Sequence, residues 1–376
     1  MGHPTLLPVF SSPKHAFRDI DELSGARRGS LGNTVGRYTT LHRLVICTRI
    51  IVAVLMSIFP AFVIAEKTAP APPGKLVDLG GHQLHVHCSG KGAPVVIVEN
   101  GLGDFSFDWK LVQNLVSRFT RVCTYDRAGY AWSDPGPKPR TFAQLNLELH
   151  DALQKLGEKG PFVLVGHSYG GPVMVNFASA YPQDAAGLVL VDSAHEGMRV
   201  SIGGKQTIRL GENAQGREIP QPHEEMTATD KFSPPASDPP PQTKLDPMYK
   251  SLPPAEQKLQ LWAQALPAIE DAENSQREWS EVYFAQWLAK PRDGSLGAIP
   301  LLILTRADGG YKDDLDVPAA QMEQERKDGQ ARLIRLSSNS TQMIVPSGHN
   351  MDLEAPAFVS FAIHRVVQAV RSHHAL

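Results

Sequence analysis

From Lys75 onward, short continuous runs of apolar residues alternate with segments in which apolar residues recur every three or four positions. The short runs, such as residues 93–101 and 161–168, predict strands that are buried on both faces of a sheet. The longer segments, such as residues 106–119 and 141–157, have the spacing of amphipathic helices. Strands and helices that alternate on this rhythm predict an α/β sandwich around a mostly parallel sheet.

The alternation breaks after residue 196 and resumes at residue 299. The intervening residues 197–298 begin with a polar, proline-rich stretch and end in two helix-like segments. Aromatic residues cluster in those segments and favour a cap whose apolar underside covers a site; they are Trp262, Trp279, Tyr283, Phe284 and Trp287. We therefore expect a core made of residues 75–196 and 299–376, with a cap insertion at 197–298.

The first 74 residues do not have the pattern of a folded domain. Residues 1–43 are polar and without apolar periodicity, and predict a disordered extension. Residues 44–65 contain an apolar run, Ile50 to Ala65, that follows several arginines, and residues 66–74 form a proline-rich linker. The apolar segment predicts either a cleaved signal peptide or, counted from Leu44, an uncleaved membrane anchor. We expect a protein that is exported (periplasmic or extracellular) or anchored in the bacterial inner membrane.

Composition narrows the possible partners. The chain has 376 residues and a net charge of −2, without a basic stripe, which argues against a nucleic-acid partner. Three cysteines are too few for a disulfide scaffold. Cys88 and Cys123 both fall in predicted strands, and we expect buried free thiols there, with one disulfide as the less favoured alternative. The histidines of the strand at 82–90 are interpreted as part of a strand face, and no metal site is expected.

The stretch VLVGHSYGGPV carries the strongest chemical signal. An apolar strand runs into Ser168, which lies between Gly166 and Gly170, and a helical pattern follows. This context predicts a nucleophile elbow. A serine nucleophile needs a base, and the loop before the final helix supplies His349.

The tetrahedral intermediate of such a reaction needs oxyanion donors, and the nucleophile's base needs an orienting acid. Backbone N–H groups of Leu102, in the turn VENGLGD, and of Tyr169, at the helix start, are the candidate donors. Two aspartates can reach a histidine on the last loop. Asp308 follows the seventh core strand and is the preferred acid; Asp192 follows the sixth and is the alternative.

Several ordered motifs resemble the α/β-hydrolase superfamily, in particular its bacterial branch of serine hydrolases related to carboxylesterases. They are VVIVENGLGDFSFDW, YDRAGYAWSDPGPKPRT, GPFVLVGHSYGGPV, GLVLVDSAHE and PSGHNMDLEAP. The resemblance implies an eight-stranded sheet with an antiparallel second strand and no cofactor. It assigns the nucleophile to Ser168, the base to His349 and the oxyanion donors to Leu102 and Tyr169. Asn100 departs from the pattern, because many members have histidine there.

Together these features predict a serine hydrolase that cleaves a small-molecule carboxylic ester through an acyl-enzyme. Serine at position 168 argues against the branches of the superfamily that use an aspartate nucleophile. Hydrolysis of a lactone, an amide or a carbon–carbon bond on the same fold remains an alternative. A ligand-binding receptor that turns over slowly is the alternative from another functional class.

Overall fold

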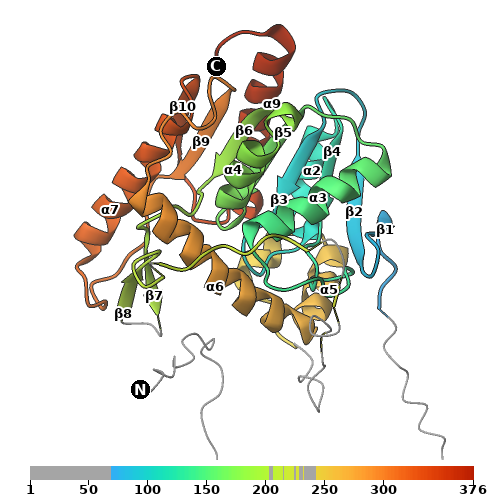
Figure 1. The fold of residues 1–376 in the computed structure, drawn as a ribbon, viewed down its shortest axis with the longest axis horizontal. Helices are drawn as coiled ribbons and strands as arrows, with labels where there is room; N and C mark the ends of the chain where they lie inside the picture. The colour runs from blue at the N-terminus through green and yellow to red at the C-terminus, as the bar shows by residue number, and fades with distance from the viewer. Residues whose placement is uncertain (1–68, 203–205, 215, 224–225, 228–231, 233–242) are drawn as a thin grey trace, which may run out of the picture. The chain divides into compact units, whose positions relative to one another are not determined.

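A computed structural model describes residues 69–202, 206–214, 216–223, 226–227, 232 and 243–376 (Figure 1). Residues 70–376 belong to one compact unit, in which the insertion and the core are not separated. The expected disordered extension and the expected signal peptide or anchor lie outside the described residues. Within the part that is described, no helix combines the length and the apolar character needed to cross a bilayer.

The core is an eight-stranded sheet in the order β1-β2-β4-β3-β5-β6-β9-β10. Strand β2 runs antiparallel to β1 and β4, and every pairing from β4 to β10 is parallel. This confirms the predicted fold class. The strands are β1 (Lys75–Asp78), β2 (Gln83–Ser89), β3 (Val96–Glu99), β4 (Val122–Tyr125), β5 (Phe162–His167), β6 (Ala185–Val191), β9 (Leu301–Arg306) and β10 (Ser340–Val345).

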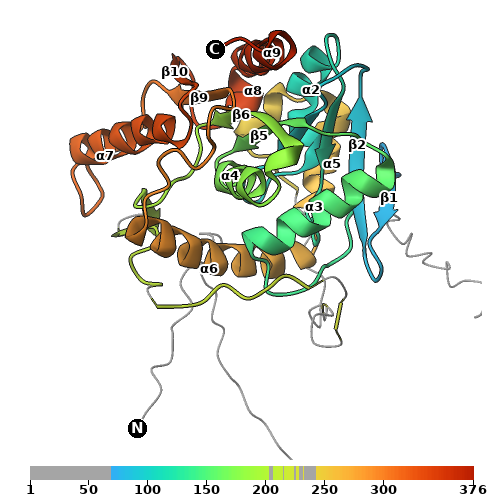
Figure 2. The same cartoon turned by 45° about the horizontal axis from the view of Figure 1, so that its top comes forward.

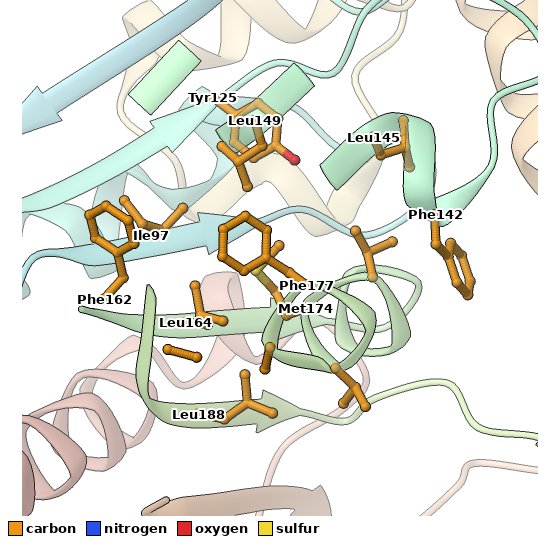
Figure 3. Packing of buried hydrophobic residues seen from close by; sticks show 14 of the residues in the cluster. Ile97, Tyr125, Phe142, Leu145, Leu149, Phe162, Leu164, Met174, Phe177 and Leu188 are labelled. Atoms are coloured by element: carbon orange, nitrogen blue, oxygen red, sulfur yellow. The ribbon is translucent and has the colours of Figure 1, made fainter. Parts of the chain in front are cut away.

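Helices cover both faces of the sheet (Figure 2). Helices α3 (Phe142–Leu156) and α4 (Gly170–Ala180) pack on one face, and α2 (Lys110–Val116) and α9 (Pro356–Ser372) on the other. Successive strand residues point to opposite faces, so the apolar runs fill two cores at once. Leu164 and Leu188 belong to the first core, as Figure 3 shows, and their neighbours Val163 and Val189 to the second.

The insertion leaves the core after β6 and returns at β9. It contains the two-stranded ribbon of β7 (Arg199–Ile202) and β8 (Gln206–Arg209), the turn η3 (Pro247–Ser251), and helices α5 (Pro254–Ala263) and α6 (Ala268–Ala289). Three of the five clustered aromatic residues named above, Tyr283, Phe284 and Trp287, pack against Phe142 at the start of α3. The ring of Trp279 instead lies under the Arg217 guanidinium, within the insertion.

The remaining elements are short turns and helices that connect the parts of the core. The 3-10 turn η1 (Ser106–Trp109) precedes α2, and η2 (Pro182–Asp184) precedes β6. Helix α7 (Ala319–Arg332) and η4 (Leu333–Leu336) connect β9 to β10, and the short α8 (Met351–Glu354) precedes α9.

The expectation of free thiols in the core is wrong. Cys88 of β2 and Cys123 of β4 form a disulfide, with their Cα atoms 4.0 Å apart. The two residues are direct partners in the antiparallel β2–β4 register. Cross-strand pairs in such a ladder have closely spaced side chains, and that register cannot be read from the sequence.

Candidate active site

Ser168 stands on the turn between β5 and α4. Its φ is +50°, a value that residues other than glycine rarely adopt. Its N–H donates to the Val191 carbonyl at 3.1 Å, and its own carbonyl accepts from Ala194 at 2.9 Å, so the end of β6 holds the turn. A Cβ at Gly170 would lie 2.5 Å from the Glu99 carbonyl oxygen, which leaves room only for glycine. These contacts build the strained strand-to-helix elbow that the sequence predicts.

His349 lies on the loop between β10 and α8. Its Nε2 is 3.0 Å from Ser168 Oγ, and its Nδ1 is 2.6 Å from Asp192 Oδ2. Because a carboxylate only accepts hydrogen bonds, the proton of the neutral ring belongs on Nδ1, and Nε2 can then accept the serine proton. The His349 side chain is 33% exposed and that of Asp192 only 3%. A hydroxyl, an imidazole and a buried carboxylate thus form one hydrogen-bonded chain.

Asp192 directly follows β6 and also has a positive φ, +39°. Its N–H donates to the Leu304 carbonyl of β9 at 2.8 Å, which fixes the residue at the end of the β6–β9 pair. Burial raises the pKa of Asp192, but the hydrogen bond from His349 and the charge of Arg306 outweigh this and hold the pKa below its ordinary value. The carboxylate is therefore ionised at neutral pH.

The expectation that Asp308 contacts His349 is wrong. Asp308 is exposed in the loop after β9, and its Oδ1 accepts from the Gly310 N–H at 2.9 Å, in a local turn. Strand β9 ends at Arg306, whose N–H donates to Asp192 Oδ1 at 3.2 Å. The carboxylate opposite His349 therefore comes from the sixth core strand, which was the alternative position.

The turn that carries Leu102 is held from behind by Arg127. The buried guanidinium donates from Nη1 to the Asn100 carbonyl at 2.8 Å and from Nη2 to the Gly101 carbonyl at 2.7 Å. Nη1 also pairs with Glu99 Oε1 at 2.6 Å. In a trans peptide the carbonyl and the next N–H point in opposite directions, so the Leu102 N–H faces away from Arg127.

The position where the chain departs from the family pattern is also supported. The Asn100 amide donates from Nδ2 to the Tyr125 carbonyl of β4 at 2.7 Å. This bond anchors the turn to the neighbouring strand. Tyr169, the second candidate donor, directly follows Ser168 and precedes the first residue of α4, where helical N–H groups lack partners in the helix.

The insertion contacts both loops that carry candidate residues. The Asn350 amide, next to His349, donates to Met248 Sδ of η3 at 3.7 Å. A Cβ placed on Gly103, next to Leu102, would lie 3.0 Å from Glu273 Oε1 of α6. Residues of η3 thus lie beside the loop that carries His349, and residues of α6 lie beside the turn that carries Leu102.

Sequence reasoning did not assign a role to Arg306 or Arg127. Arg127 belongs to the motif YDRAGYAWSD, which follows a predicted strand. The motif draws attention to this arginine, but it does not indicate which groups the arginine contacts. Arg306 gives no such signal, because its partner Asp192 lies 114 residues away in the chain.

Comparison with known proteins places this geometry in a family. A sequence profile described as "Alpha/beta hydrolase family" matches residues 95–360. The probable transporter efuK of Hormonema carpetanum is 36% identical over 129 residues, which cover 32% of this chain and 18% of that protein. An AB hydrolase superfamily protein of Gibberella zeae is 34% identical over 107 residues, 27% of this chain and 33% of that one. The chain thus matches only a third or less of the length of these relatives.

A solved structure gives the same fold over more of the chain. The enol-lactonase from Burkholderia xenovorans superposes with a TM-score of 0.51 at 15% sequence identity, covering 76% of this chain and 97% of that one. At this identity the likeness concerns the fold alone. The profile matches most of the chain, and the sheet order and the elbow agree with it: the protein belongs to the α/β-hydrolase family.

Proposed function

We propose that this protein is a serine hydrolase that cleaves small-molecule carboxylic esters through an acyl-enzyme intermediate. The observation that carries the proposal is the hydrogen-bonded chain from Ser168 Oγ through His349 to the buried Asp192, set at an elbow of positive φ. The membership of the chain in a family of hydrolases supports it.

In the first half of the proposed reaction, Ser168 Oγ attacks the ester carbonyl carbon while its proton passes to His349 Nε2. The carbonyl oxygen becomes an oxyanion, to which the N–H groups of Leu102 and Tyr169 donate. The carbon–oxygen bond to the alcohol then breaks, and the alcohol leaves with the proton from His349. Asp192 stabilises the imidazolium while it exists.

In the second half, a water molecule transfers a proton to His349 and attacks the acyl carbon. The bond to Ser168 Oγ breaks, the serine takes the proton back, and the carboxylic acid is released. Arg127 holds the turn of Leu102 through two hydrogen bonds, and Tyr169 directly precedes α4, so we expect the donors to need little reorganisation during either step.

The decisive experiment combines a fluorophosphonate probe with a panel of acyl esters of increasing chain length. We expect the probe to label Ser168 and the panel to show turnover. Ser168→Ala should fold normally and lose turnover by a factor on the order of a million, as when a serine that acts with its base is removed.

Three results would contradict the proposal. They are absence of labelling, retention of more than a few percent of activity in Ser168→Ala, and turnover of amides or carbon–carbon bonds without turnover of any ester. Labelling without turnover of any substrate would indicate the receptor alternative.

We also propose that the protein is exported or anchored in the bacterial inner membrane. The proposal rests on the apolar run after Arg49, which lies outside the described residues. The Cys88–Cys123 disulfide supports it, because disulfides persist mainly in oxidising compartments such as the periplasm.

A further inference from the structure

Arg306 and the candidate base His349 both contact the carboxylate of Asp192. Arg306 Nη1 lies 3.0 Å from Asp192 Oδ2, the same oxygen that His349 Nδ1 contacts at 2.6 Å. The Arg306 side chain is only 10% exposed, so solvent screens the guanidinium weakly. One carboxylate oxygen therefore lies between a fixed cation and the imidazole.

A second basic group faces His349 from the end of β5. His167 Nε2 donates to the His349 backbone carbonyl at 2.9 Å, and its Nδ1 lies 3.4 Å from Asp104 Oδ2. A carbonyl can only accept, so His167 Nε2 carries a proton in this arrangement, and the Asp104 carboxyl beside Nδ1 favours a second proton there. The His167 side chain is 1% exposed, and its ring centroid is 4.8 Å from that of His349.

We propose that Arg306 and His167 are positioning residues that keep His349 neutral, and so able to accept the serine proton, at mildly acidic pH. Both would act through His349, since neither contacts Ser168 Oγ in the described structure. The inference rests on the proposed function only in taking His349 as the base.

Other polar and charged groups also surround Arg306 and Asp192. Arg306 Nη2 donates to Tyr311 Oη at 3.4 Å. Arg326 of α7, which is paired with Glu323, adds further positive charge facing Asp192. Asp192 is thus in contact with more than one basic group. His349 contacts only Oδ2 of Asp192, and Oδ1 accepts from the Arg306 backbone N–H.

Beyond His167 lie carboxyl groups that maintain its charge. Burial opposes the charged form of His167, but Asp104 and the charge of Asp352 raise its pKa to about 9. Burial raises the pKa of Asp352 to about 7, against the charge of His167. Asp352 therefore loses its charge as the pH falls below neutral, and Asp104 is the carboxyl that favours the charged form of His167 there.

The direction of the effect on His349 follows from these charges. Burial and the positive charges of His167 and Arg306 lower the pKa of His349, and Asp192 raises it, with a net lowering from the ordinary 6.5. A base must be unprotonated to act, so a lower pKa extends activity toward acid. Removal of either cation should raise the pKa and move the acid limb of the pH profile to higher pH.

The test measures the rate of Ser168 labelling by a fluorophosphonate probe in the full-length chain from pH 4.5 to 9. Arg306→Gln and, separately, His167→Gln should each move the acid limb upward by about one pH unit. Arg306→Lys keeps the charge and should leave the limb near its wild-type position. Arg335→Gln, the matched control, removes an exposed arginine that contacts Asp293 and should also leave the limb in place.

A merely structural role predicts a different result. Loss of packing would lower the labelling rate at every pH and leave the limb where it is. That outcome in Arg306→Gln would overturn the proposal, as would an equal shift in Arg306→Lys. If His167→Gln fails to fold, the Arg306 series alone decides.

Failure of the proposed hydrolase function can be distinguished from failure of the proposal for Arg306 and His167. It would appear as absence of labelling in the wild-type chain at every pH. The inference would then be decided by an NMR titration of the His349 imidazole in Ser168→Ala, with and without Arg306→Gln. An unchanged His349 titration would overturn it.

Discussion

Strained backbone marks two of the residues that carry the site. Ser168 and Asp192 both have positive φ although neither is glycine, and they follow β5 and β6, which are neighbours in the sheet. Such conformations cost about 1–3 kcal/mol each and persist only where the surroundings determine them. Here the determining contacts are the main-chain bonds from Ser168 to Val191 and from Asp192 to Leu304. The strain is held by the pairing of β5, β6 and β9.

The identity of the acid gives a residue-scale prediction. Asp192→Asn removes the charge that stabilises the imidazolium and should lower ester turnover by about ten-thousand-fold. Asp308→Asn, the matched control, changes only a local turn and should retain turnover close to wild type. Circular dichroism should first establish that both variants fold, and steady-state rates then decide. The reverse pattern of rates would refute the assignment to Asp192.

The sequence could predict Ser168 and His349 but not choose between the two aspartates. The elbow is a local pattern, and the base follows from chain order before the last helix. The acid depends on where the loop after β9 turns, and Asp308 turns outward into a bond with Gly310. Nothing in the residues near Asp308 specifies that direction.

At the scale of elements, the β2–β4 pair differs most from the expectation. The disulfide joins the antiparallel strand β2 to β4, the strand next to β3. It closes a loop of 35 residues that includes β3, the turn of Leu102 and α2. The covalent link therefore restricts the unfolded chain in the segment that contains Leu102, one of the two candidate oxyanion donors.

Replacement of Cys88 and Cys123 together by alanine should lower the free energy of unfolding by about 2–4 kcal/mol, because the unfolded chain gains the entropy of an open loop. The measurement is the urea midpoint of oxidised wild type, reduced wild type and the double variant. Cys47→Ser is the matched control, since it leaves the pair intact. Equal midpoints for the oxidised and reduced wild type would contradict the prediction.

At the scale of the whole molecule, the sheet and its covering helices were predictable from the sequence. Continuous apolar runs such as that ending at His167 favour strands with both faces covered, because they are short and are followed by helical patterns, and their order along the chain implies parallel crossovers. The arrangement of the insertion was less predictable. Tyr283 and Trp287 do pack on Phe142, but Trp279 packs within the insertion, which aromatic clustering alone does not distinguish.

Localisation gives a prediction for the whole chain. In a bacterial host, the full-length protein should fractionate with the membrane or the periplasm, because the apolar run from Ile50 to Ala65 directs it there. Deletion of residues 1–65 should retain a chain in the cytosol, and Leu55→Arg should reduce export. N-terminal sequencing separates a cleaved signal from an anchor. Recovery of the intact full-length chain as a soluble cytosolic protein would rule out both.

The direct pairing of β6 with β9 has a consequence for how new specificities could arise. Val191 pairs with Leu304, so the strands that present Asp192 and Arg306 are aligned by the sheet itself, although more than a hundred residues separate them in the chain. The segment between the two strands is therefore not needed to align the charged groups. Its helices and ribbon can be diversified or exchanged between related chains, as a cassette, while the reacting groups keep their places.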